Sequence, residues 1–63
     1  MKNYLYQRRK QLALTQKEIA KAIGVSEATV SRYEDGNIAN MKRDKIAAYA
    51  KILRTTPDFI MNG

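Results

Sequence analysis

The sequence predicts an all-α fold of five short helices joined by short connections. No segment has the sustained apolar and polar alternation of a β-strand, and apolar residues instead recur at helical spacing. Gly24, Gly36 and Pro57 lie where helices are expected to end or begin. With 63 residues, 44% of them hydrophobic, the chain is long enough for one small domain with a core, expected over residues 1–63.

The first two helices have recognisable boundaries. The first is expected over residues 4–12, with Asn3 as its N-cap. The second begins after Thr15, because Thr15 and Glu18 have the spacing of a capping box. It is expected to end at Gly24, which can take the left-handed backbone conformation that closes a helix.

The third and fourth helices follow on either side of an irregular segment. The third is expected to begin after Ser26, a second N-cap, and to end near Gly36. Residues 37–41 have no predicted regular structure. The fourth helix is expected over residues 42–53, where one stripe at helical spacing carries Ile46, Tyr49, Ala50 and Leu53.

The fifth helix is short. Thr56 is its expected N-cap, and Pro57 occupies the first helical position, where a backbone N–H is not needed. The residues expected to make its apolar contacts are Phe59, Ile60 and Met61.

Residues 16–35 have the pattern of a helix-turn-helix. Ala20 is small enough to let the next helix pack closely, and Gly24 permits the tight turn. Val25 is expected to point back inward, and Val30 supplies an apolar position on the second helix of the motif. Such a motif leaves the outer face of its second helix free to enter the major groove of DNA.

Two charged residues fall on stripes that are otherwise apolar. Arg9 shares a helical face with Leu5 and Leu12, and Glu34 lies four residues after Val30. Because an unpaired buried charge is unfavourable, we expect Arg9 and Glu34 to form a structural salt bridge, for which a bidentate geometry is available. The alternative is that both side chains tilt outward into water.

The outward face of the third helix is the candidate base-reading surface. It carries Glu27, Ala28, Ser31 and Arg32. Arg32 can donate to guanine O6 and N7, Glu27 can accept from cytosine N4, and Ala28 can contact a thymine methyl. Small residues allow close approach to the bases, whereas an ordinary solvated face, the alternative, more usually carries long charged side chains.

Polar residues on both sides of this face are candidate phosphate ligands. Such contacts position a protein on the duplex without reading its sequence. The expected phosphate-binding residues are Gln16, Ser26, Asn37, Asn40, Lys42 and Arg43.

Charge and composition narrow the function further. Twelve Lys and Arg against six Asp and Glu give a net charge of +6, which suits a polyanion such as DNA. The chain has no Cys and no His, so we expect no metal site, no cofactor and no enzyme activity. No apolar run approaches a membrane span and no signal peptide is evident, so the cytoplasm is the expected location.

Taken together, these residues resemble the Cro/C1-type (XRE) helix-turn-helix domain of phage repressors. The matching segments are LTQKEIAKAIGVSEATVSRYEDG, IAAYAKIL and TPDFIMNG, and the likeness spans nearly the whole chain. The resemblance implies a five-helix, lambda-repressor-like domain. It also implies a phosphate contact at Gln16, base reading by Glu27, Ala28 and Arg32, an internal salt bridge between Arg9 and Glu34, and a dimer axis near Phe59 and Ile60.

The chain departs from the family pattern at two points. Ala13 stands where members often have Gly, so the turn after the first helix is expected to be tightened differently. Asn40 and Met41 replace a loop that frequently contains Pro, so the resemblance does not predict the backbone path into the fourth helix.

The function expected from this sequence is that of a transcriptional repressor. It would bind a palindromic double-stranded DNA operator as a homodimer that is weak for the isolated domain. The chain would be either a complete small repressor or the DNA-binding part of a longer one with a C-terminal oligomerisation domain. The alternative is an antitoxin-like module that binds a partner protein and touches DNA secondarily. An apolar surface near the fifth helix that stays exposed in an isolated DNA complex would favour that alternative.

Overall fold

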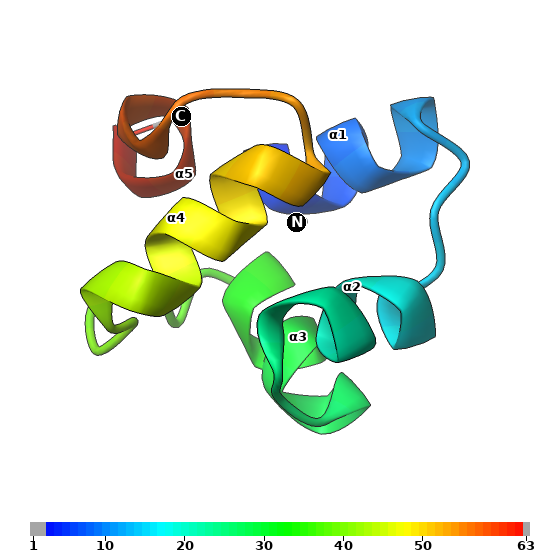
Figure 1. The fold of residues 1–63 in the computed structure, drawn as a ribbon, viewed down its shortest axis with the longest axis horizontal. Helices are drawn as coiled ribbons and strands as arrows, with labels where there is room; N and C mark the ends of the chain where they lie inside the picture. Colours follow the sequence, from blue (N-terminus) through cyan, green and yellow to red (C-terminus); the bar gives the residue numbers. More distant parts are fainter. Residues whose placement is uncertain (1–2, 63) are drawn as a thin grey trace.

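The computed structural model describes residues 3–62, which form an all-helical fold (Figure 1). The helices are α1 (Tyr4–Gln11), α2 (Gln16–Ile23), α3 (Glu27–Glu34), α4 (Arg43–Ile52) and α5 (Pro57–Asn62). The described part of the chain contains no β-strand. The predicted fold class is therefore confirmed, and the predicted helix boundaries lie close to the observed ones. None of the helices within residues 3–62 has the length and apolar character needed to cross a membrane.

The helix ends form through the local contacts that the sequence indicates. The Asn3 side chain accepts a hydrogen bond from the Tyr6 amide and caps α1. At α2, the Glu18 amide donates to Thr15 Oγ1 at 3.1 Å and the Thr15 amide donates to Glu18 Oε1 at 2.9 Å, which completes the capping box. Gly24 ends α2 in the left-handed conformation, with φ 76°.

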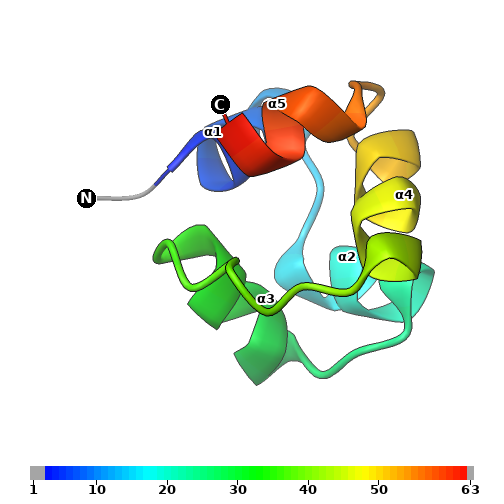
Figure 2. The same cartoon turned by 90° about the vertical axis from the view of Figure 1, so that its left-hand side faces the viewer.

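The helices form a closed ring around the core (Figure 2). Within the described chain, α2 packs on α3 and on α4, α4 packs on α5, and α1 joins α5 to α3. Every helix contributes to the buried core, whose members are Leu5, Ile19, Ala20, Ile23, Val30, Met41, Tyr49, Ala50, Leu53 and Ile60. Ile46, expected on the buried stripe of α4, is half-buried at its edge.

Two expectations about apolar contacts need correction. Phe59 and Met61 were expected to pack as Ile60 does, but they are 53% and 38% exposed, because a helix this short turns only Ile60 into the core. Phe59 does stack against the ring of Tyr4, at 5.6 Å between ring centres. Met41 belongs to the segment without predicted structure, and it is buried.

Two helices end in a left-handed residue that is not glycine. Ala13, which follows α1, has φ 57°, and Arg54, which follows α4, has φ 54°. L-residues rarely adopt this conformation because Cβ crowds the carbonyl oxygen that follows it. The turn after α1 therefore keeps the backbone path that glycine would allow, although the residue is alanine.

Candidate nucleic-acid interface

The α2–α3 connection holds the two helices of the motif in close contact. The carbonyl of Ala20 accepts hydrogen bonds from the amides of Gly24, at 2.8 Å, and Val25, at 3.0 Å. Ala20 is buried, so the small side chain at this position lets α2 and α3 approach each other. Ser26 then caps α3, its Oγ accepting from the Thr29 amide at 3.1 Å. Helix α3 lies at the edge of the ring with one face turned away from the core (Figure 2).

The outward face of α3 presents most of the residues proposed to read bases. Glu27, Ala28 and Arg32 are exposed, whereas Ser31 is half-buried. Within residues 3–62, no hydrogen bond or ion pair holds the Arg32 guanidinium. Its donors are therefore available to a ligand.

On the opposite face of α3, Glu34 pairs with Arg9 of α1. Arg9 Nε donates to Glu34 Oε2 at 2.5 Å and Arg9 Nη2 donates to Oε1 at 3.2 Å, which is a bidentate arrangement. Glu34 is fully buried and Arg9 is only 8% exposed. Of the two alternatives for these side chains, the inward pair is thus the one observed. The hydrogen bond to Glu34 raises the pKa of Arg9 above its ordinary value, so the guanidinium stays charged.

Further contacts fix α3 against α1. Arg9 Nη1 donates to the Leu14 carbonyl at 2.9 Å, which ties the pair to the turn after α1. The Asn3 side chain donates to the Tyr33 carbonyl at 2.7 Å, and the Asn3 amide donates to the Glu34 carbonyl. The orientation of α3 is therefore set from α1 as well as from α2.

Gln16, the expected phosphate ligand at the start of α2, is also part of this network. Its Nε2 donates to Glu34 Oε1 at 3.1 Å. Sequence reasoning missed this bond, because nothing in the spacing of two residues on different helices indicates it. One of the two amide hydrogens of Gln16 is used in this way, and the other is not required by Glu34.

A polar hollow lies next to Gln16, at the beginning of α2. It has a volume of about 490 Å³ and its charged lining residues are Arg9, Lys10, Lys17 and Glu27. Three of these side chains are cationic, and Glu27 approaches from α3. Lys10 and Lys17 had no specific role in the sequence prediction, and the fold brings them to the same hollow as Gln16.

The remaining expected phosphate ligands are exposed on other parts of the motif and its flank. They are Ser26, Asn37, Asn40, Lys42 and Arg43. The Asn37 amide donates to the Arg32 carbonyl, so this residue lies directly at the end of α3. Lys42 and Arg43 form the beginning of α4, where Lys42 makes no side-chain cap. No group of three or more potential metal-binding side chains exists within residues 3–62.

A five-helix ring in which α2 and α3 form this motif, with α3 exposed along one face, is a helix-turn-helix DNA-binding domain. A family model described as helix-turn-helix matches residues 5–60. The chain belongs to the Cro/C1-type (XRE) helix-turn-helix family, a family of DNA-binding regulators. No curated protein and no solved structure matches the chain significantly.

Proposed function

We propose that this chain is a transcriptional repressor that binds double-stranded DNA sequence-specifically and places α3 in the major groove. The observation that carries this proposal is the exposed face of α3. On its buried face, the same helix is fixed to α1 by the pair of Arg9 and Glu34. A reading helix must be held in a fixed orientation, because bases are discriminated by directional hydrogen bonds.

The proposed base-reading residues are Glu27, Ala28, Ser31 and Arg32. Arg32 is the strongest candidate, because its exposed guanidinium has no partner among the described side chains and can donate twice to guanine O6 and N7. Ala28, one turn earlier, is small enough to allow close approach to a thymine methyl. Ser31 is half-buried, so we expect it to contact DNA only at the edge of this face.

Phosphate groups of the two strands are proposed to bind on either side of α3. On one side, the free amide hydrogen of Gln16 and the cationic hollow beside it offer donors to one phosphate. On the other side, Asn37, Asn40, Lys42 and Arg43 are exposed near the end of α3 and the beginning of α4. Ser26 Oγ, at the N-terminus of α3, is the remaining proposed contact.

A homodimer on a palindromic operator is proposed because one short helix contacts only a few base pairs. The exposed apolar side chains of Phe59 and Met61 on α5 supply a small apolar surface that a second copy could cover. Since these are the only large apolar residues exposed within residues 3–62, the dimer of the isolated domain is expected to be weak in the absence of DNA.

The same surface favours one second candidate, an antitoxin-like module whose α5 binds a partner protein. Sedimentation with and without operator DNA separates the two functions. Operator-dependent association of two copies supports the dimer, whereas a DNA complex that stays monomeric leaves the α5 surface for another protein.

The experiment that tests DNA reading is selection of bound sequences from a random duplex library at a stated salt concentration. We expect a site with dyad symmetry, whose half-site centres are roughly 34 Å apart, about one turn of the double helix. Recovery of sequences without any base preference would overturn the proposed role of α3.

A further inference from the structure

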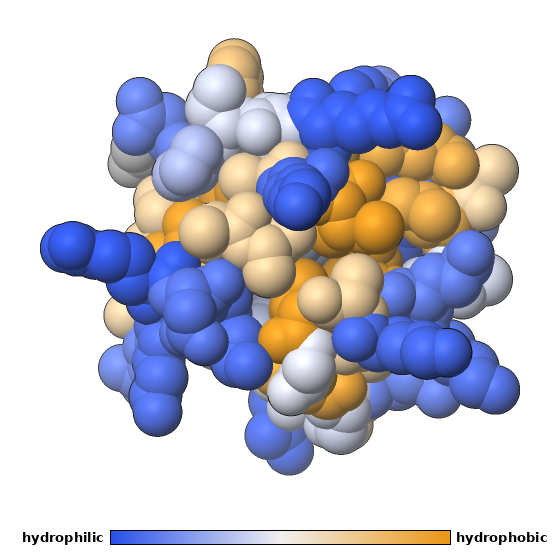
Figure 3. Space-filling model, viewed as in Figure 1, coloured by the Kyte–Doolittle hydropathy of each residue, from blue (hydrophilic) through white to orange (hydrophobic). Residues whose placement is uncertain are grey.

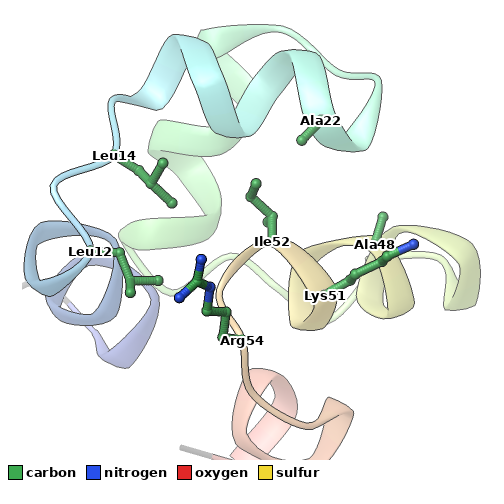
Figure 4. Close-up of a pocket in the computed structure, with 7 residues that line it drawn as sticks. All are labelled: Leu12, Leu14, Ala22, Ala48, Lys51, Ile52 and Arg54. Carbon is green, nitrogen blue, oxygen red and sulfur yellow. The ribbon is translucent and has the colours of Figure 1, made fainter.

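An open apolar groove lies on the side of the molecule where α1 ends, between α2 and α4 (Figure 4). Its volume is about 670 Å³, and its apolar lining consists of Leu12, Leu14, Ala22, Ala48 and Ile52. Leu12, Leu14, Ala48 and Ile52 pack on the core from one side and are only partly buried, whereas Ala22 is exposed. Figure 3 shows hydrophobic surface open to solvent over this region, bordered by hydrophilic residues.

The groove shares no residue with the proposed DNA contacts. Its walls come from the turn after α1, the last turn of α2 and the second half of α4, whereas the proposed contacts occupy the first residues of α2, helix α3 and the beginning of α4. DNA binding therefore does not explain why these apolar side chains are accessible to solvent.

Both left-handed residues that are not glycine border this groove. Ala13 lies between the lining residues Leu12 and Leu14, and Arg54 is itself a lining residue. Arg8 holds the second turn in place, since its Nε donates to the Leu53 carbonyl at 2.9 Å and its Nη2 to the Arg54 carbonyl at 3.4 Å. This clamp fixes the backbone of Arg54, and its guanidinium points into the groove (Figure 4).

The charge of the groove is wholly positive. Lys51 and Arg54 are its charged lining residues, and no carboxylate lines it. Within residues 3–62, neither cation has a hydrogen-bonded or ion-paired partner for its side chain. The groove thus combines an apolar floor with two unpaired cations at its edge.

We propose that this groove binds a short acidic amphipathic segment of a partner protein. Apolar side chains of that segment would cover Leu12, Leu14 and Ile52, and its carboxylates would pair with Lys51 and Arg54. Ala22 and Ala48 on the facing walls are small, so a helix can lie close between α2 and α4. A second copy of this chain is a poor occupant, because its own net charge of +6 opposes a cationic groove. A small molecule is a poor occupant too, because ligand sites enclose most of the ligand surface, whereas this groove is open.

The test uses synthetic peptides of about 12 residues, which is roughly three helical turns. One peptide carries leucines on one face and glutamates on the other, a second replaces the glutamates with lysines, and a third replaces the leucines with alanines. Binding to the 63-residue chain is followed by backbone amide NMR signals at about 0.15 M salt. We expect only the first peptide to shift the signals of Leu12, Ala22, Ala48 and Ile52.

A matched pair of variants distinguishes peptide binding in the groove from nonspecific attraction of an acidic peptide to a basic protein. Lys51→Glu and Lys42→Glu change the net charge equally, and both side chains are exposed on or next to α4. The two positions lie about 14 Å apart along the helix axis, beyond the roughly 8 Å over which charges act at this salt concentration. We expect Lys51→Glu to weaken the first peptide about tenfold and Lys42→Glu to change its affinity by less than about twofold.

Four outcomes would overturn the proposal. One is the absence of groove shifts at about 1 mM peptide, where even weak binding is visible. Another is equal weakening by Lys51→Glu and Lys42→Glu, and a third is equal binding of the peptide without leucines, because each indicates diffuse charge attraction only. The fourth is a shift of groove signals on dilution of the chain alone, which would mean that a second copy occupies the groove. Duplex affinity, measured in parallel, reports on the proposed DNA function separately.

Discussion

At the scale of single residues, the pair of Arg9 and Glu34 connects stability to the orientation of α3. Both partners are buried and bonded at two points, so removing either leaves an uncompensated charge in the core. We expect Arg9→Ala and Glu34→Ala each to lower the free energy of unfolding by about 3–5 kcal/mol. The double variant should lose less than the sum of the two. A double-mutant cycle by urea unfolding measures this difference, and a coupling energy near zero would contradict the pairing.

Tyr49 is a different kind of buried polar residue. Its ring packs in the core, 6.1 Å from that of Tyr33, but its hydroxyl has no hydrogen-bond partner within the described chain. Tyr49→Phe keeps the ring and removes an unsatisfied group, so we expect unfolding stability to stay equal or rise by about 1 kcal/mol. Burial also raises the pKa of this hydroxyl above its ordinary value of 10.0.

The raised pKa gives this variant a second signature. Because the pKa is raised, the folded state favours the neutral hydroxyl over the ionised one. The resulting contribution to the free energy of unfolding is complete below pH 10 and is lost as the pH rises above the pKa of the unfolded chain. Tyr49→Phe should therefore lose less stability above pH 10 than the parent chain. Identical pH profiles would contradict the raised pKa, and a clear loss of stability at neutral pH would show that the hydroxyl makes a hydrogen bond.

Arg32 and Lys42 distinguish base reading from phosphate binding. A bidentate contact to guanine contributes about 1–3 kcal/mol of discrimination, so Arg32→Ala should relax the preference at one base pair in each half-site. Lys42→Ala should weaken binding to all duplexes by a similar factor. Affinities for a panel of single-base operator changes provide the measurement. If Arg32→Ala weakens binding to all duplexes equally, Arg32 contacts a phosphate, and the proposed base-reading face of α3 is wrong.

At the scale of the elements, the helix ends that depend on left-handed residues give a matched comparison. Gly24→Ala would place a residue with a Cβ atom in the left-handed conformation, at φ 76°. The added Cβ would not clash, because its nearest neighbour, Lys45 Nζ at 3.4 Å, is the end of a flexible side chain. We expect a loss of about 1 kcal/mol that comes from the backbone conformation. Ala13→Gly reverses the change at an exposed position with φ 57°, and should stabilise by up to about 1 kcal/mol. Thermal unfolding of both variants tests the pair, and a loss of stability in Ala13→Gly would contradict it.

The predictability of an element depends on how local its determinants are. The capping box of Thr15 and Glu18 and the turn at Gly24 involve residues within a few positions of each other, so the sequence alone indicates them. The salt bridge was predictable because each charge interrupts an apolar stripe. The bond from Gln16 to Glu34 and the burial of Met41 depend on how separate segments meet, and no periodicity marks them. The exposure of Phe59 and Met61 follows from the shortness of α5, which composition does not indicate.

At the scale of the whole molecule, the ring of helices separates two surfaces with different chemistry. The α3 side presents the proposed reading residues and the polar hollow, whereas the α2–α4 groove presents apolar side chains between two cations. Because α2 lies between α3 and α4, it contributes to both surfaces, with Gln16 at its beginning and Ala22 near its end. A segment bound in the groove therefore contacts the helix that braces α3, while the reading face stays open to the duplex.

The net charge of +6 belongs to the molecule as a whole and predicts how its affinity for duplex DNA depends on salt. Each phosphate neutralised releases condensed counterions, so about 4–6 phosphate contacts per half-site give a slope near −4 to −5 for log K against log salt. Lys42→Ala should make this slope shallower by about one unit, whereas Lys51→Ala, on the groove, should leave it nearly unchanged. Fluorescence anisotropy titrations of a single half-site duplex at several salt concentrations measure the three slopes. An affinity that does not change between low and moderate salt would exclude a mechanism based on phosphate contacts, and equal effects of the two lysine variants would place the α2–α4 groove against DNA.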